Sequence, residues 1–221
     1  MSELRPGVIF DVDGTLLDTN YLHVLSWWQA MNDAGHQDVA MSDIHRAIGI
    51  ASEGLTEHLL GTEDEKAIEA HSERYEALRD QVTAFPRAAD LVRACGRRGL
   101  TPVLATSGKE EDLEWMLPAI GAGDDFAGTT TSSDVGEGKP APDLLTTAME
   151  EHRLDPARTV AVGDTVWDVK AAKKAGIACI AVLSGGISEA ELREAGADEV
   201  YDDPADLLEH LGESLVGRLT D

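Results

Sequence analysis

Two acidic residues that follow a short apolar run are the first candidates for chemistry in this chain of 221 residues. The run at residues 8–10 predicts a buried strand, and Asp11 and Asp13 come directly after it. Because side chains two positions apart on a strand point to the same side, both carboxylates are expected to face one space. Gly14 lets the backbone turn there, and Thr15 can cap the turn. Either a cation or a proton stabilises such a pair, or the stretch is simply a strand followed by a solvated acidic turn.

Hydroxyl side chains follow a second predicted strand, at residues 101–105. Thr106 and Ser107 come directly after this strand and precede Gly108 and a predicted helix. A hydroxyl and free backbone N–H groups in such a place can bind phosphate. The same residue types are also common as plain turn and cap residues, so the signal is weak by itself.

A lysine and a second acidic pair occur further along the chain. Lys139 is followed by prolines at positions 140 and 142, which would fix the loop and aim the side chain. Asp164 follows the predicted strand at residues 159–162, and Asp168 lies four positions later, on one helix face if a helix begins between them. Asp168 is therefore either a functional residue or an acid favoured by the dipole at a helix start.

The elements that must position these residues predict an α/β fold. Predicted strands alternate with predicted helices, which indicates a Rossmann-like parallel sheet with helices on both faces. Ligands of such sheets bind outside the carboxyl ends of the strands. The remaining predicted strands are 126–131, 177–183 and 199–201, and the helices are 87–98, 110–120, 141–152, 168–175, 189–195 and 205–211.

Residues 18–82 interrupt this alternation with helical patterns only, at 41–47, 54–60 and 63–81 after a first helix. The first helix is predicted from the spacing of Leu22, Leu25, Trp28 and Met31. Trp27 and Trp28 are interpreted as helix-packing residues rather than a ligand site. The chain is thus expected to have an α/β core domain at 1–17 and 83–221 and an inserted, all-helical cap domain at 18–82.

The charge of the chain limits its partners. It has 42 acidic and 18 basic residues and a net charge of -24, which argues against binding to nucleic acid or to an anionic membrane surface. The acidic surface fits a salt-rich environment and equally a very soluble protein. Cys95 and Cys179 lie in apolar stretches and are expected to be core thiols. No signal segment or membrane-spanning run is found, so a cytoplasmic location is expected.

The order of these motifs resembles that of the haloacid dehalogenase-like hydrolases. Residues 11–15 match the first signature, Asp-x-Asp-Gly-Thr after a strand. Thr106, the segment 138–140 around Lys139 and the pair Gly163-Asp164 resemble the second, third and fourth signatures, so the resemblance covers nearly the whole chain. It implies that Asp11 attacks phosphorus, that Asp13 is the general acid and base, and that Thr106 and Lys139 bind the phosphoryl group.

The resemblance also implies a Mg²⁺ cofactor. The ligands would be Asp11, Asp164 and the carbonyl of Asp13, with Asp168 holding a metal-bound water. Further residues implied to contact the substrate are Gly14, Thr15, Thr19, His23, Arg46 and Ser107.

The position of the insert resembles the helical-cap subgroup, which includes phosphoglycolate phosphatases and β-phosphoglucomutases. In that subgroup the cap closes over the site and selects small soluble substrates. The predicted function is therefore a Mg²⁺-dependent phosphatase that hydrolyses a small phosphorylated metabolite through an aspartyl-phosphate intermediate. The chain would act as a monomer or a homodimer, and its leaving group cannot be predicted from the cap sequence.

Two alternatives remain open at this point. Thr19 and His23 match residues that follow the first signature in β-phosphoglucomutases, but Ser52 stands where those mutases have a phosphate-binding arginine. His45 and Arg46 either supply a cationic contact from the cap or are exposed helix residues. A catalytically silent binding module is the second alternative, although no signature residue is missing. Asp13 also disfavours dehalogenation and phosphonate hydrolysis, because enzymes of those kinds lack an acid there.

Overall fold

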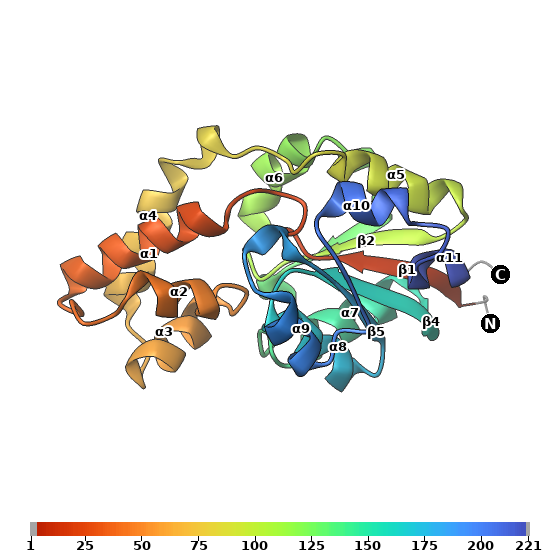
Figure 1. The fold of residues 1–221 in the computed structure, drawn as a ribbon. Helices are drawn as coiled ribbons and strands as arrows, with labels where there is room; N and C mark the ends of the chain where they lie inside the picture. The colour runs from red at the N-terminus through yellow and green to blue at the C-terminus, as the bar shows by residue number, and fades with distance from the viewer. Residues whose placement is uncertain (1–3, 220–221) are drawn as a thin grey trace.

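The structure, a computed structural model that describes residues 4–219, is built on a six-stranded parallel sheet (Figure 1). The strand order is β3-β2-β1-β4-β5-β6, so β1 and β4 lie in the middle. Residues that follow these two strands therefore come together at the centre of the sheet's carboxyl edge. The strands are β1 (Arg5–Phe10), β2 (Thr101–Ala105), β3 (Gly128–Thr130), β4 (Leu154–Gly163), β5 (Ala178–Val182) and β6 (Glu199–Tyr201).

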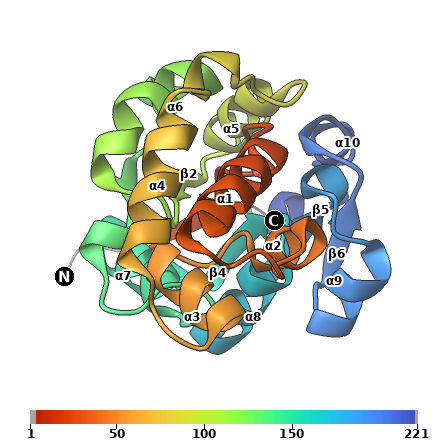
Figure 2. The same cartoon turned by 90° about the vertical axis from the view of Figure 1, so that its left-hand side faces the viewer.

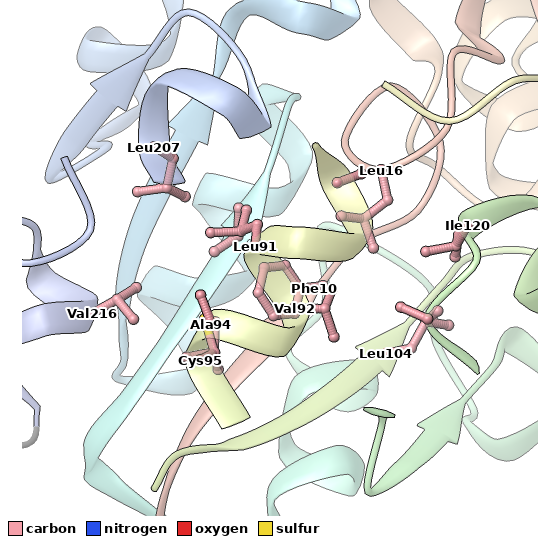
Figure 3. Packing of buried hydrophobic residues seen from close by; sticks show 14 of the residues in the cluster. Phe10, Leu16, Leu91, Val92, Ala94, Cys95, Leu104, Ile120, Leu207 and Val216 are labelled. Atoms are coloured by element: carbon pink, nitrogen blue, oxygen red, sulfur yellow. The ribbon is translucent and has the colours of Figure 1, made fainter. Parts of the chain in front are cut away.

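Alternate side chains of the strands enter two hydrophobic cores, one on each face of the sheet. Val8 and Phe10 lie in the first core and Ile9 lies in the second, as the two-residue period of a strand requires. Figure 3 shows Phe10 among side chains of the helix that contains Leu91 and Val92. Helices α5 (Ala88–Arg97), α6 (Leu113–Ile120), α10 (Pro204–Glu209) and α11 (Leu215–Arg218) contribute to the first core, and α7 (Asp143–His152), α8 (Val166–Ala175) and α9 (Glu189–Ala195) to the second.

Four helices form a separate layer beyond one end of the sheet (Figures 1 and 2). They are α1 (Asn20–Ala34), α2 (Met41–Ala47), α3 (Ser52–Leu60) and α4 (Glu65–Glu76), and we call them the cap helices. They have a hydrophobic core of their own, whose buried residues are Val24, Trp27, Met31, Ile44, Ala47, Ile48, Leu55 and Ala67. The cap helices can therefore keep their arrangement independently of the cores of the sheet.

The two segments that join the cap helices to the sheet are hydrogen-bonded to each other. The N–H of Asp18 donates to the carbonyl of Thr83 at 2.9 Å, and the N–H of Phe85 donates to the carbonyl of Leu16 at 2.9 Å. Leu17 and Ala84 form an antiparallel bridge between them. The chain therefore leaves the sheet and returns to it at one place.

The first cap helix buries only part of the set of residues from which it is predicted. Val24, Trp27 and Met31 are buried, whereas Leu25 and Trp28 are 36% and 37% exposed. The predicted packing role is confirmed for Trp27 and wrong for Trp28. Adjacent helical residues point about 100° apart, so only one of two consecutive tryptophans can face the other cap helices.

The predicted helix at 63–81 is shorter in the structure. Asp64 accepts hydrogen bonds from the N–H groups of Lys66 and Ala67, which makes it the N-cap and starts α4 at Glu65. The helix ends at Glu76, and a 3₁₀ turn at Arg79–Gln81 follows. Other 3₁₀ turns are Glu110–Asp112, Gly123–Asp125, Ser132–Asp134 and Leu183–Gly185.

Several other boundaries also differ from the prediction. Strand β4 begins earlier, at Leu154, and helix α8 begins earlier, at Val166, because Thr165 is its N-cap. Both cysteines are free and buried, as expected. No helix within residues 4–219 is long and apolar enough to cross a membrane.

Candidate active site

Four of the predicted residues meet at the carboxyl edge of the sheet. Asp11 follows β1, Thr106 follows β2 and Asp164 follows β4, while Lys139 lies in the loop before α7. All four side chains are buried. The ammonium of Lys139 lies 2.5 Å from Asp11 Oδ1, which is a charge-assisted hydrogen bond across the edge. The motifs are far apart in sequence, but parallel strands end on the same side, so they become neighbours.

Three buried carboxylates form a cluster at this edge. One oxygen of each of Asp11, Asp164 and Asp168 lies within 4.8 Å of the others. Burial, together with the charges of Asp168 and Asp13, raises the pKa of Asp11 to about 7 despite its contact with Lys139. Burial and the charges of Asp168 and Asp11 raise the pKa of Asp164 well above its ordinary range. The charge of one lysine thus does not neutralise three carboxylates, and a bound cation would neutralise the remaining negative charge.

Asp168 uses both of its oxygens within the protein. Oδ1 lies 2.6 Å from the ammonium of Lys139, and Oδ2 accepts from the N–H and the hydroxyl of Thr165 at 3.0 and 2.5 Å. A Cβ at Gly163 would lie 2.5 Å from the Asp168 side chain, so only glycine fits at this position. Burial opposes the charged form of Lys139, but Asp11 and Asp168 prevail and raise its pKa above the ordinary value. Asp168 therefore holds a charged lysine beside Asp11.

Asp164 is oriented by side chains from the first loop and the first cap helix. The amide of Asn20 donates to Asp164 Oδ2 at 2.7 Å and to the carbonyl of Gly185 at 3.2 Å. The hydroxyl of Thr15 lies 3.1 Å from an oxygen of Asp11 and 3.3 Å from one of Asp164. Asn20 Oδ1 is buried and has no hydrogen-bond partner in the described part of the chain. These contacts hold the cluster in place, and Asn20 Oδ1 lies beside it without a hydrogen-bond partner among the described residues.

Two glycines leave room for this cluster. Gly14 has a φ of 76°, and a Cβ there would lie 2.3 Å from Asp164 Oδ2. A Cβ at Gly185 would lie 1.6 Å from the same oxygen. The donors around this space are carboxylate and amide oxygens, which are ligands of hard cations such as Mg²⁺. The residues present therefore fit a divalent metal ion.

Asp13 lies on the side of the cluster that faces a cavity. Its Oδ1 accepts from the hydroxyl of Thr19 at 2.6 Å and lies 3.2 Å from His23 Nε2. Burial works to raise the pKa of Asp13, but the charge of His23 and hydrogen bonds from His23 and Thr19 hold it below the ordinary value. His23 Nδ1 in turn lies 3.1 Å from His71 Nε2, so a row of polar side chains runs from Asp13 into the cap helices.

The cavity lies between the sheet edge and the cap helices and has a volume of about 400 Å³. Asp11 and Asp13 lie at its inner end. Its wall includes four rings from three helices, namely Trp27, His71, Tyr75 and Trp115. Sequence reasoning missed His71, Tyr75 and Trp115, and also Asn20 at the acidic cluster. None of these residues belongs to a motif; only the packing of α1, α4 and α6 brings them to the site.

The remaining predicted site residues have other contacts. Thr106 is fully buried, and its hydroxyl accepts from the N–H of Gly108 at 3.0 Å. Ser107 lines the cavity and donates to the carbonyl of Gly49 in the cap at 2.9 Å. The carbonyl of Gly14 accepts from Ser184 at 2.7 Å.

Arg46 is not brought to the site, because its side chain is 61% exposed and pairs with Glu191 at 3.3 Å. The chain thus follows the alternative in which Arg46 is a surface residue. Its neighbour His45 instead contacts the carbonyl of Gly185 through Nε2 at 2.8 Å.

The cap helices are docked on the sheet through a few polar contacts. Trp167 Nε1 donates to the carbonyl of Arg46 at 2.8 Å, in addition to the contacts of Ser107 and His45 described above. A Cβ at Gly138 would lie 2.8 Å from the Cβ of Ala51, so the loop that carries Lys139 also lies against the cap. The structure thus shows the cap helices in contact with the loops at the sheet edge, on which the cavity lies.

Comparison with known proteins gives a consistent picture. A family model described as haloacid dehalogenase-like hydrolase matches residues 6–176, which is more than half of the chain. A probable phosphatase, IndB, from Dickeya dadantii is 30% identical, with 90% of each chain covered. A phosphoglycolate phosphatase from Agrobacterium fabrum is 26% identical and covers 97% of this chain and 96% of its own. The crystal structure of a hydrolase from Pseudomonas syringae has a TM-score of 0.88 and 35% identity, covering 95% of this chain and 99% of that one.

Proposed function

The chain belongs to the haloacid dehalogenase-like hydrolases and is a phosphoric monoester hydrolase, and we propose that it transfers the phosphoryl group of a small soluble ester to Asp11 and then to water. The observation that carries this proposal is the placement of two acids with different surroundings at the inner end of one cavity. Asp11 contacts Lys139, whereas Asp13 contacts Thr19 and His23. One acid is thus arranged to act as a nucleophile and the other to move protons.

In the first step an oxygen of Asp11 forms a bond to phosphorus while the bond from phosphorus to the alcohol oxygen breaks. Lys139, held by Asp11 and Asp168, is placed to neutralise charge on the phosphoryl oxygens. Asp13 gives its proton to the departing alcohol. The negative phosphate beside Asp13 raises its pKa above the low value of the free protein, which favours the protonated form that this step needs.

In the second step Asp13 takes a proton from water as the water oxygen attacks phosphorus. The bond between phosphorus and Asp11 breaks, which releases phosphate and restores the Asp11 carboxylate. Thr19 and His23 hold Asp13 in one orientation, so the same carboxyl group can serve in both steps.

We propose that the metal ion is Mg²⁺, held by Asp11, Asp164 and the backbone carbonyl of Asp13, with Asp168 contributing through a water. When bound, it would neutralise the acidic cluster and polarise the phosphoryl oxygens. The three neighbouring carboxylates, the raised pKa values of Asp11 and Asp164 and the unused oxygen of Asn20 support this assignment.

We further propose that residues 18–82 act as a cap domain on a core of residues 1–17 and 83–221. Support comes from the separate hydrophobic core of the cap helices and from the single place at which the chain crosses between the two parts. Closure of the cap would exclude bulk water and position the ester in the cavity.

The proposal is tested by measuring phosphate release from a panel of small phosphomonoesters with and without Mg²⁺. Turnover is expected to require Mg²⁺ and to disappear in Asp11→Asn, which keeps the size of the side chain and loses the nucleophile. Asp13→Asn should lose turnover of esters with poor leaving groups and keep more with p-nitrophenyl phosphate, whose leaving group needs no proton. Turnover by Asp11→Asn at the wild-type rate would refute the assignment of the nucleophile, and isomerisation of a sugar phosphate without phosphate release would favour a mutase.

A further inference from the structure

The rim of the cavity carries more negative than positive charge. Five acidic residues of the described chain line it besides Asp11 and Asp13, whereas Arg79 and Lys109 are its lining cations. The five acidic residues are Glu53, Glu76, Glu111, Asp112 and Glu114. We call these five residues the acidic rim. The field at the entrance therefore attracts positive groups and repels negative ones.

Of the two lining cations, one is already paired within the protein and the other borders an acidic segment. Arg79 pairs with Glu76 at 2.6 Å. Lys109 directly precedes the acidic residues at 110–112. The remaining lysine of the site, Lys139, contacts Asp11 and Asp168 and is assigned to the phosphoryl group that reacts. A carboxylate or second phosphate on the alcohol would thus meet five acids and two cations, of which Arg79 is already paired.

Stacked rings line the wall of the cavity. Trp27 stacks on His71 with centroids 4.0 Å apart, and His23 stacks on Tyr75 at 3.8 Å. Trp115 approaches Tyr75 edge-on at 5.9 Å. Burial and the charges of His23 and Lys109 hold the pKa of His71 well below its ordinary value, so this ring adds no positive charge. Aromatic walls of this kind attract cationic groups, above all ammonium groups, through the negative faces of their rings.

We propose that the cavity selects phosphomonoesters whose alcohol carries a positive charge, such as amino or quaternary ammonium alcohols, and disfavours esters with a second anionic group. This inference rests on the proposed phosphatase function and specifies its substrate class. Under the proposed function, Lys139 and a bound metal ion would hold the phosphate at the inner end, so the acidic rim and the aromatic wall would act on the alcohol alone. Ser52 and Ser72 also line the cavity, and their hydroxyls can contact polar atoms of the alcohol.

The test compares three esters that share a two-carbon alcohol and differ in charge. They are O-phosphoethanolamine, which carries an ammonium; 2-hydroxyethyl phosphate, which is neutral beyond its phosphate; and 2-phosphoglycolate, which carries a carboxylate. The expected order of kcat/KM follows this sequence, with the ammonium ester about tenfold or more above the carboxylate ester at low salt. The ratio should shrink as ionic strength rises, because the acidic rim is exposed to solvent. Any order in which the ammonium ester is not preferred would overturn the proposal.

Two variants on α4 distinguish the effect of the acidic rim on this preference from the effect of the protein's net charge. Glu76→Gln removes one acid of the rim and frees Arg79, so it should lower the ratio of the ammonium to the carboxylate ester several-fold. Glu73→Gln removes an exposed acid of the same helix that does not line the cavity, and it should leave the ratio unchanged. An equal effect of the two variants would show that the net charge of -24 sets the preference, which contradicts the proposal.

Binding measurements keep this inference separate from the proposed function. Calorimetry with Asp11→Asn and the same three esters in Mg²⁺ buffer reports the preference of the cavity without turnover. If no ester is hydrolysed by the wild type but the ammonium ester binds best, the proposed function fails and the charge preference stands. If hydrolysis depends on Asp11 but the carboxylate ester binds and reacts best, the phosphatase stands and the charge preference fails.

Discussion

Asp168 is one of the two acids that hold the ammonium of Lys139 at the carboxyl edge of the sheet. Its two oxygens join Lys139 to Thr165, which caps α8. A carboxylate at the start of a helix is common for stability alone, but here the same group faces the ammonium that also contacts Asp11, the proposed nucleophile. Asp168 is thus a positioning residue as well as an N-terminal partner of its helix.

Asp168→Asn is expected to lower kcat by roughly tenfold to a hundredfold with a smaller change in KM, because Lys139 loses the charge that holds it beside Asp11. Steady-state kinetics at saturating Mg²⁺ would check this. The matched control is Thr165→Val, which removes the hydroxyl partner but keeps the ion pair; it should destabilise the fold by about 1 kcal/mol and leave kcat closer to wild type. A larger loss of kcat in Thr165→Val than in Asp168→Asn would contradict the positioning role.

Sequence reasoning at this scale finds residues that belong to motifs. Asp11, Lys139 and Asp164 each follow a strand or precede a helix in a recognisable pattern, and the structure brings them together. Asn20 and His71 carry no such pattern. They reach the site only because α1 and α4 pack against each other and against the sheet edge, which is a property of the tertiary structure.

Among the elements, the cap helices determine access to the cavity. They touch the rest of the chain through polar contacts, and in the opening that precedes the proposed closure of the cap a loop-to-loop contact such as that of Ser107 with Gly49 would be exchanged for water. Trp167 makes the contact with the largest side chain, since its ring also lies edge-on to His58 at 5.3 Å while its N–H bonds the carbonyl of Arg46. The hydrogen bond of Trp167 therefore favours the docked arrangement.

Trp167→Phe keeps an aromatic ring and removes this N–H. The docked arrangement should lose about 0.5–1.5 kcal/mol, which corresponds to a rise in KM of roughly two- to tenfold with a smaller change in kcat. Arg46→Gln is the control at the same place, because it removes only the exposed ion pair with Glu191 and should change KM by less than about twofold. If Arg46→Gln raised KM more than Trp167→Phe, the surface ion pair rather than the indole hydrogen bond would hold the cap.

Helix and strand types could be predicted from the sequence better than their faces and ends. Strand β2 is apolar and buried from Pro102 to Ala105 because both faces of the sheet are covered, and this leaves a clear signal. The spacing on α1 identifies the buried Met31 but not the rest of the buried face, because hydrophobic residues such as Leu25 and Trp28 also occur on its exposed side. The end of α4 depends on the turn at Arg79–Gln81, for which spacing gives no indication.

At the scale of the whole molecule, the arrangement concentrates negative charge around one lysine. The net charge is -24, and the most buried acids lie where we propose that the substrate phosphate binds. Without a cation, Asp11 and Asp164 hold protons to a higher pH than ordinary carboxyl groups. Metal binding, protonation and stability are therefore linked.

Mg²⁺ is expected to raise the melting temperature, and by more near pH 8 than near pH 5.5. A raised pKa means that the metal-free site keeps its protons until the pH passes about 7 at Asp11, so the metal must displace them at low pH and not at high pH. Thermal unfolding with about 5 mM MgCl₂, against NaCl of equal ionic strength, measures the difference. Asp164→Asn should abolish the Mg²⁺-specific shift. A shift of the same size at both pH values would contradict the linkage.

The fold class is predicted well at this scale because alternation of strands and helices leaves few topologies, and parallel strands place every motif at one edge. The acidic rim could not be predicted. Glu76 and Glu114 lie on separate helices, and an acidic protein offers many such residues without any sign of which ones surround a cavity.

The paired crossing segments at Leu16–Asp18 and Thr83–Phe85 have a consequence for how such a protein can change over generations. Because the insert leaves and rejoins the core at adjacent hydrogen-bonded positions, the core closes in the same way whatever length of chain lies between them. Helices there can be lengthened, lost or exchanged without disturbing the edge that carries Asp11 and Lys139. The junction thus allows the core, which carries the proposed reaction, and the insert, which is proposed to select the substrate, to change separately. A protein with a grafted insert could therefore act on a new ester by the same reaction.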